Sequence, residues 1–156
     1  VSVNGKIGNG YILKISSENW TLFDEDHIGI DLYQLANLAV DNRNNVYASI
    51  DYSLSSLADM SRPNIIKYNG KKWTVHNPVD NTGESLGYVG NITADLNGNL
   101  WASVYGWDDV YLAVHNGQKW VHSGSALPIN RSTVIAVDAS NTIWIGTGDG
   151  IYLIEQ

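Results

Sequence analysis

The sequence predicts an all-β chain built from repeated four-stranded antiparallel units. Three observations point there: a turn-rich composition, a segment that occurs three times without gaps, and a second short element in which a Trp follows a tight turn. Hydrophobic residues make up 44% of the 156 residues and charged residues 16%, with 15 Gly, 6 Trp and 9 Tyr. Aromatic residues separated by Gly-rich turns are typical of strands and hairpins, not of helical or disordered chains.

The first repeated element predicts two strands joined by a short polar turn. It reads LAVDNRNNVYASI at 38–50, ITADLNGNLWASV at 92–104 and IAVDASNTIWIGT at 135–147. Each copy has an apolar triplet, an Asp, a polar turn, and an aromatic residue six positions after the Asp. Self-similarity at a period of about 40 to 50 residues indicates a repeat architecture.

The second element predicts another hairpin. IKYNGKKW at 66–73 and AVHNGQKW at 113–120 place an Asn-Gly pair between a strand and a Trp, and LKISSENW at 13–20 is a weaker copy. Because both residues of an Asn-Gly pair accept a positive φ, we expect type I′ turns. In chain order the two elements give strands A, B, C and D, the four strands of a β-propeller blade.

Large aromatic side chains recur on strands B and D, where they would pack neighbouring blades face to face. We predict that six of them lie in the core: Tyr47, Trp101 and Trp144 on strand B, and Trp20, Trp73 and Trp120 on strand D. The small residues Ala39, Ala94 and Ala136 on strand A are expected where strands crowd around a central axis.

WIGTGDGIYLI at 144–154, preceded by the turn at Asp138, resembles the two-component regulator propeller repeat, Asp-x-x-Gly-Asn-Leu-Trp-x-Gly-Thr-x-x-Gly-Leu. DLNGNLW at 95–101 matches its first half, whereas Tyr47 stands where the family has Trp. The resemblance implies β-propeller blades in the periplasmic sensor region of a hybrid histidine kinase, or in a related secreted or surface protein. A similar turn in the streptogramin-lyase-like propellers keeps an enzyme as an alternative.

The strand count predicts a single propeller segment over 1–156, with about 3.5 blades. We expect a partial blade at 1–34, full blades at 35–90 and 91–132, and a partial blade at 133–156. Because both ends then carry a strand C, closure of a ring within the chain is awkward. Open edges favour pairing, so we expect self-association or a larger propeller of which the chain is a part.

The charge pattern argues against nucleic acid and membranes as partners. The formal net charge is -7, and the nine basic residues are scattered singly rather than gathered in a patch. No stretch approaches the roughly 20 apolar residues of a membrane-spanning helix. The chain has no Cys, which excludes disulfides, thiolate nucleophiles and cysteine zinc sites.

The short A–B and C–D turns of a blade fall on one face of a propeller, so the longer loops gather on the other face. We expect ligand at that long-loop face, because loops on a rigid scaffold carry function more often than the scaffold does. The predicted ligand-binding residues are Tyr52, Tyr105, Trp107, Asp108 and Asp109. Their rings can stack on a sugar or aromatic ligand while the carboxylates accept hydrogen bonds, although Trp107 also fits a plug between blades.

We predict no cofactor and no metal. The Asp- and Asn-rich turns lack the spacing of an EF-hand loop and fit Asx-stabilised hairpins instead. The four histidines, His27, His76, His115 and His122, form no metal-binding pair on one strand face, and His115 occupies the repeat position of Tyr68, which favours a structural role. The adjacent acids at 24–26 and 108–109 are more typical of a solvated surface than of an acid and base pair.

These observations predict a non-catalytic module that binds a small molecule, a glycan or a protein, in a periplasmic or extracellular sensor. One alternative is a lyase-like or hydrolytic propeller enzyme, which needs His and acid side chains converging near the axis on the long-loop face. The other is a structural assembly unit joined through its open blade edges.

Overall fold

The computed structural model describes residues 10–30, 32, 34–51, 62–106, 110–122 and 134–156, and these form four antiparallel sheets. The strands are β1 (Ile12–Ile15) and β2 (Trp20–Phe23) in the first sheet; β3 (Leu35–Val40), β4 (Val46–Ile50), β5 (Ile65–Tyr68) and β6 (Trp73–Val75) in the second; β7 (Tyr88–Ala94), β8 (Leu100–Tyr105), β9 (Val110–His115) and β10 (Trp120–His122) in the third; and β11 (Val134–Val137), β12 (Ile143–Thr147) and β13 (Gly150–Ile154) in the fourth. A short helix, α1, spans Glu25–Ile28. Within these residues no helix has the length and apolar character needed to cross a membrane.

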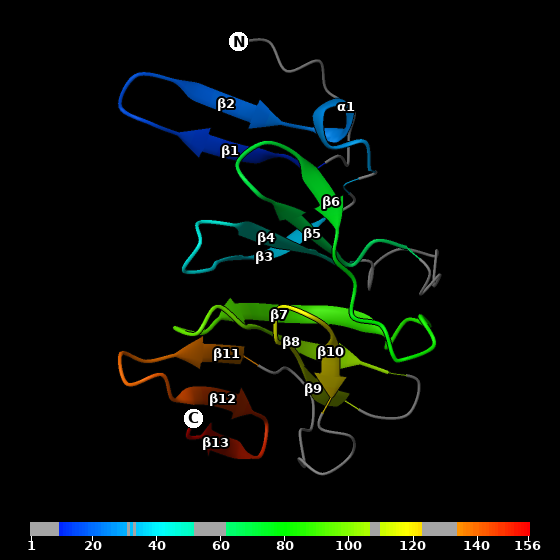
Figure 1. Cartoon of the computed structure of the whole chain (residues 1–156), viewed down its shortest axis with the longest axis vertical. Coiled ribbons are helices and arrows are strands. Elements are labelled where there is room, and N and C mark those ends of the chain that lie inside the picture. The colour runs from blue at the N-terminus through cyan, green and yellow to red at the C-terminus, as the bar shows by residue number, and fades with distance from the viewer. Residues whose placement is uncertain (1–9, 31, 33, 52–61, 107–109, 123–133) are drawn as a thin grey trace.

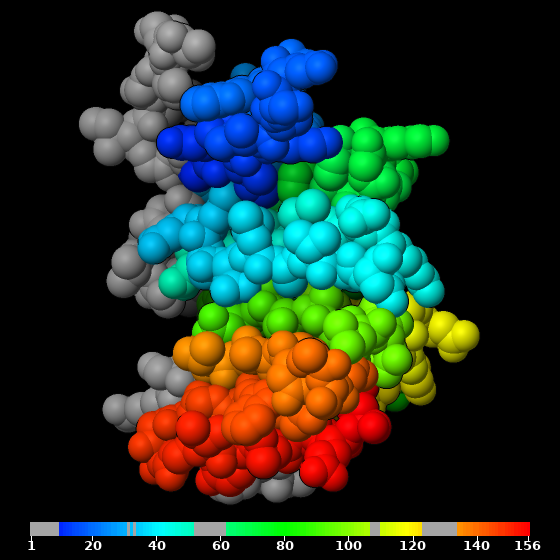
Figure 2. Space-filling view, turned by 90° about the vertical axis from the view of Figure 1, so that its left-hand side faces the viewer, coloured from blue at the N-terminus to red at the C-terminus, as the bar shows by residue number. Residues whose placement is uncertain are grey.

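The sheets are stacked in chain order, and each strand pairs with its neighbour in sequence (Figure 1). The first strands of the second, third and fourth sheets form the inner edge of the stack, where β7 contacts both β3 and β11. The short A–B turns lie together on one side, and Figure 2, which looks onto that side, shows the sheets as successive layers. This is the arrangement of β-propeller blades, and it confirms the predicted fold class.

An Asp carboxylate organises each A–B turn. In the third sheet Asp95 Oδ1 accepts the backbone N–H of Asn99 (2.8 Å), while Oδ2 accepts the Asn99 side-chain amide (2.7 Å) and the indole N–H of Trp101 (3.0 Å). One carboxylate therefore closes the turn and fixes the ring at the start of strand B. The six-residue spacing between Asp and the aromatic residue follows from this bridge.

The same bridge occurs in the neighbouring sheets. The Tyr47 hydroxyl donates to Asp41 Oδ2 (3.1 Å), and the Trp144 indole N–H donates to Asp138 Oδ2 (2.8 Å). Burial by itself favours the neutral acid at Asp41, but the hydrogen bonds from Asn45, Arg43 and Tyr47 outweigh it and hold the pKa of this carboxyl below its ordinary value. Tyr and Trp suit the aromatic position because each carries a polar hydrogen that can reach the carboxylate.

The turn also needs a left-handed residue three positions after the Asp. Asn44, Gly98 and Asn141 occupy that position, with φ of 61°, 83° and 66°. Asn and Gly tolerate this region better than other residues. The recurrence of Asn or Gly in this turn is thus explained by the backbone conformation that the turn requires.

The prediction that the Asn-Gly pairs form type I′ turns is wrong. Gly70 and Gly117 have a φ of 89°, whereas Asn69 and Asn116 are not among the residues with positive φ. Instead, the Asn69 side-chain oxygen accepts the N–H groups of the two residues after Gly70 (both 3.0 Å), and Asn116 does the same in the third sheet (both 3.1 Å). The Asn closes the turn through its side chain, so only the Gly needs the unusual backbone.

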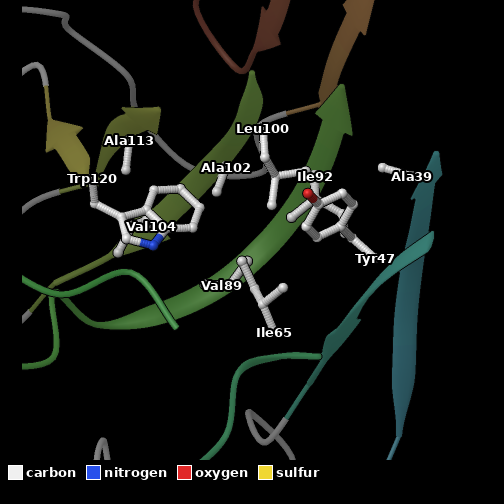
Figure 3. Packing of buried hydrophobic residues seen from close by; sticks show 10 residues of the cluster. All are labelled: Ala39, Tyr47, Ile65, Val89, Ile92, Leu100, Ala102, Val104, Ala113 and Trp120. Carbon is white, nitrogen blue, oxygen red and sulfur yellow. The ribbon is translucent and has the colours of Figure 1, made fainter. Parts of the chain in front are cut away.

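Three hydrophobic clusters fill the spaces between successive sheets. The middle cluster, drawn in Figure 3, takes Ala39, Tyr47 and Ile65 from the second sheet and Val89, Ile92, Leu100, Ala102, Val104, Ala113 and Trp120 from the third. In β8 alternate residues serve different clusters: Leu100 and Ala102 face the second sheet, whereas Trp101 packs toward the fourth. Sheets buried on both faces account for strands that are apolar along most of their length.

The expectation that six aromatic residues lie in the core is wrong for two of them. Tyr47, Trp101 and Trp120 are buried and Trp73 is partly buried, but Trp20 is 73% exposed and Trp144 is 41% exposed. Trp20 lies on the outer face of the first sheet and Trp144 on the outer face of the fourth, where no further described sheet packs. The repeat position determines on which face of the sheet an aromatic side chain lies, but that side chain is buried only where a neighbouring blade packs on the same face.

The Asp41–Tyr47 bridge can be tested without changing the size of the ring. Tyr47→Phe removes the hydroxyl and leaves a buried carboxylate oxygen with one partner fewer, so we expect a loss of about 1 to 2 kcal/mol in the free energy of unfolding. Urea denaturation measures it. Tyr11→Phe, which changes an exposed tyrosine, is the control, and equal stability of the two variants would contradict the role given to the bridge.

Candidate ligand-binding site

The inner strands of the second and third sheets bulge near their N-terminal ends. In β3 the register leaves Ala36 without a partner on β4, and in β7 it leaves Gly90 and Asn91 opposite Ser103. Bulges bend a strand, re-aim its side chains and often lie beside functional sites. Two successive blades thus have the same irregularity at the same end.

Two buried serines hold the β7 bulge in place. Ser49 and Ser103 occupy equivalent positions on strand B, and both are fully buried. Ser103 Oγ accepts the backbone N–H of Asn91 (2.9 Å), and Ser49 Oγ donates across the blade junction to the carbonyl of Gly90 (3.0 Å). The bulge is therefore fixed from its own sheet and from the preceding one.

The bulge brings Tyr105 against the backbone. A Cβ on Gly90 would lie 2.7 Å from Cε2 of Tyr105 and 3.0 Å from Oγ of Ser103. A side chain at this position would force the ring of Tyr105 to move, so glycine is favoured here by close approach rather than by its φ. The ring of Tyr105 has a defined position at the end of β8.

A hollow of about 560 Å³ opens at this end of the inner strands. Three successive sheets line it, through Ala36, Asp51, Tyr88, Val89, Gly90, Asn91, Tyr105 and Val134. Asp51 follows β4 and Tyr105 ends β8, so both stand where strand B passes into a B–C loop. The hollow thus belongs to the long-loop face, opposite the A–B turns.

The structure places one of the five predicted ligand-binding residues in the hollow. Tyr105 lines it, whereas Tyr52, Trp107, Asp108 and Asp109 lie outside the described residues. Tyr52 directly follows a residue of the lining, and Trp107 comes two positions after Tyr105.

Sequence reasoning missed the contribution of the inner strands. Ala36, Tyr88, Gly90, Asn91 and Val134 come from strand A or its start, not from the long loops. A signal was present: a glycine inside an apolar strand, as in YVGNITA at 88–94, marks a bulge or a close approach of the backbone. Its meaning depends on Tyr105, which is distant in sequence.

A second set of polar rings lies farther out, between the second and third sheets. The ring centroid of His76 is 4.4 Å from that of His115, 5.4 Å from that of Tyr47 and 5.7 Å from that of Trp120. Burial lowers the pKa of His76 to about 4, and repulsion from Lys67 and from His115 in its protonated form adds to this effect. Burial and Lys67 likewise lower the pKa of His115. This part of the junction is therefore built from neutral imidazoles.

His115 packs in the same way as Tyr68, the residue at the equivalent position of the preceding repeat. Its ring lies 5.3 Å from Trp120, as Tyr68 lies 5.0 Å from Trp73. Its Nδ1 accepts the backbone N–H of Gly117 (3.2 Å) within the C–D turn. Among the described residues no three His, Asp or Glu side chains are placed to hold a metal.

The acidic run at 24–26 has a structural use. Asp24 is the N-cap of α1: its Oδ1 accepts the backbone N–H of His27 (3.2 Å) and lies 2.6 Å from the Nδ1 of the same residue. These hydrogen bonds hold the pKa of Asp24 below its ordinary value. The side chain is thus engaged in starting the helix with which the D–A connection begins.

A model of the two component regulator propeller matches residues 126–149. The matched stretch contains β11, the turn at Asp138 and β12, and it confirms the resemblance seen in the sequence. Among curated proteins no match was found.

A solved structure supports the fold. It comes from a study of PorZ, described as an essential bacterial surface component of the type-IX secretion system of Porphyromonas gingivalis. The two structures agree with a TM-score of 0.54 over 95% of this chain, at 15% sequence identity. The chain spans 29% of the length of that protein, and a likeness at this identity concerns the propeller fold alone.

The neutral state of His76 can be measured directly. We expect its imidazole to titrate near pH 4 in proton NMR, because protonation must desolvate a charge beside His115 and Lys67. The ordinary pKa is 6.5, so between pH 6.5 and 4 the unfolded chain binds the proton more readily, and the free energy of unfolding falls as the pH is lowered through this window. His76→Phe should flatten that fall. A His76 pKa near 6.5 would contradict this account.

Proposed function

We propose that this propeller segment binds a small polar ligand with an apolar face, such as a sugar unit of a glycan, in the long-loop hollow and without converting it. The observation that carries the proposal is the hollow itself, which three blades line and which the β7 bulge shapes. Its volume of about 560 Å³ lies within the range of pockets that hold small ligands, roughly 300 to 1,000 Å³.

The lining suits recognition through stacking and hydrogen bonds. Tyr88 and Tyr105 supply aromatic surface, while Asp51 and Asn91 supply a carboxylate and an amide. Aromatic rings with a few fixed polar groups are the usual means of orienting a small ligand. Tyr105 is held by its packing on Gly90, so little conformational entropy is lost when a ligand stacks on it.

The same lining favours binding over the enzyme alternative. General acid and base catalysis needs two titratable groups within reach of one substrate. Asp51 is the carboxylate among the described lining residues, whereas His76 and His115 line a different hollow, of about 320 Å³, near the outer strands. Asp24 is engaged as a helix cap.

The two component regulator propeller match supports a place for this binding step in an extracytoplasmic sensor. In such a protein the hollow would receive the signal molecule. Because its walls come from three blades, a bound ligand would contact all three and resist their relative movement.

Filling the hollow tests the proposal. Ala36 is exposed on the β3 bulge, so Ala36→Trp should occupy the hollow and leave the fold intact. We expect a panel of monosaccharides and disaccharides, screened by saturation-transfer NMR and measured by calorimetry, to include ligands whose affinity falls at least tenfold in this variant. Tenfold corresponds to about 1.4 kcal/mol.

Ser140→Trp is the matched control, because it adds the same side chain at an exposed position of an A–B turn on the opposite face. It should leave every affinity unchanged. A panel without ligands, or ligands that bind both variants as tightly as the unmodified chain, would exclude this hollow as a sugar site.

A further inference from the structure

The outer face of the first sheet is apolar. Ile15 pairs with Trp20, and the alternation along β1 puts Leu13 on the same side as Ile15. Tyr11, directly before β1, continues this alternation. These four side chains are 56% (Tyr11), 40% (Leu13), 60% (Ile15) and 73% (Trp20) exposed. We call them the leading face. A sheet that faces water on one side normally has polar residues there, so this composition needs a cause.

The outer face of the fourth sheet has the same character. Trp144 pairs with Leu153, and Gly146 pairs with both Val134 and Ile151, which places Val134, Trp144, Ile151 and Leu153 on one side. Their exposed fractions are 60%, 41%, 71% and 54%. We call these four the trailing face. The two faces lie at opposite ends of the stack (Figure 1).

Inside the stack the repeat counterparts of both faces are buried or partly buried. Trp120 is the counterpart of Trp20 and is 8% exposed, and Ala113 is the counterpart of Leu13 and is fully buried. On the other side, Trp101 corresponds to Trp144 and is 9% exposed, and Leu112 corresponds to Ile151 and is 2% exposed. Each face therefore has the pattern of a surface that packs against a blade.

The internal junctions also show which surfaces fit together. Between the second and third sheets, trailing positions such as Tyr47 pack in one cluster with leading positions such as Ala113 and Trp120. Between the third and fourth, the trailing residues Trp101 and Leu112 pack on the fourth sheet. A trailing surface thus meets a leading surface, and this chain exposes one of each.

We propose that copies of this chain associate head to tail, with the trailing face of one copy packed on the leading face of the next as a further blade junction. The two faces use different residues, so the interface is heterologous, and repetition of the contact gives either a closed ring or a growing array. The occupant of each face is a second copy because the complementary surface is present on the same chain. The large exposed side chains of both faces are uncharged, so their burial leaves none of these groups as an unpaired charge.

Single substitutions on opposite faces distinguish pairing of the two unlike faces from nonspecific hydrophobic association. Trp20→Glu places a charge on the leading face, and Ile151→Glu places one on the trailing face; both positions are more than two thirds exposed in the single copy. We expect the unmodified chain to associate in sedimentation experiments as its concentration rises, and each variant alone to remain a monomer.

A mixture of the two variants provides the decisive observation. The Trp20→Glu chain keeps an intact trailing face and the Ile151→Glu chain keeps an intact leading face, so the mixture should form a one-to-one dimer that neither variant forms alone. Leu96→Glu, at an exposed apolar position on an A–B turn, should associate as the unmodified chain does. Circular dichroism verifies that each variant is folded. Ile15→Glu on the leading face and Leu153→Glu on the trailing face form a second pair of variants for the same mixing experiment.

A monomeric unmodified chain at all concentrations would overturn the proposal, and the faces would then belong to contacts with other partners. A mixture that stays monomeric would overturn it as well, because association would then not depend on the pairing of unlike faces. Ligand binding in the hollow is tested on Ala36 and Ser140, so failure of either proposal can be recognised independently.

Discussion

Each blade depends on the hydrogen bonds that one aspartate accepts in its A–B turn. The Asp95 carboxylate joins the turn backbone at Asn99 to the indole of Trp101, and Asp41 and Asp138 do the same in their own sheets. A single side chain thus fixes the turn, the register of strands A and B, and the position of a large ring. Because the ring reaches the carboxylate from strand B, it is held on the side of the sheet that meets the next blade.

Further hydrogen bonds connect these turns to one another. The Asn42 side chain donates to the Leu96 carbonyl (2.9 Å), and the Asn141 side-chain oxygen accepts the Leu96 N–H (2.6 Å). Successive blades are therefore tied at the A–B end of their inner strands, and a Cβ on Gly98 would collide with Asn42 at 2.6 Å. The opposite end of the same strands lacks the Asp bridge, and that is where β3 and β7 bulge and the hollow opens.

The strands and their order could be predicted because the repeat expresses local rules: Asp before a turn, Asn or Gly within it, and an aromatic residue at a fixed spacing. The hollow could not be predicted in full, since Gly90 and Tyr105 acquire their roles only when the bulge brings them together. The prediction that Trp20 and Trp144 are buried is wrong for a different reason. Their sequence positions match those of buried counterparts, but burial depends on a neighbouring sheet that a local pattern does not encode.

Val134 belongs to both of the surfaces for which a function is proposed. It lines the long-loop hollow, and its side chain is 60% exposed on the trailing face. A copy packed on that face would cover Val134 and change one wall of the hollow, while a ligand in the hollow would change the surface offered to the next copy. Where both events occur, each must alter the affinity of the other by the same factor, because the coupling free energy between two binding sites is reciprocal. The blade junction is therefore the place where recognition and assembly would be linked, and Val134 is the side chain that takes part in both.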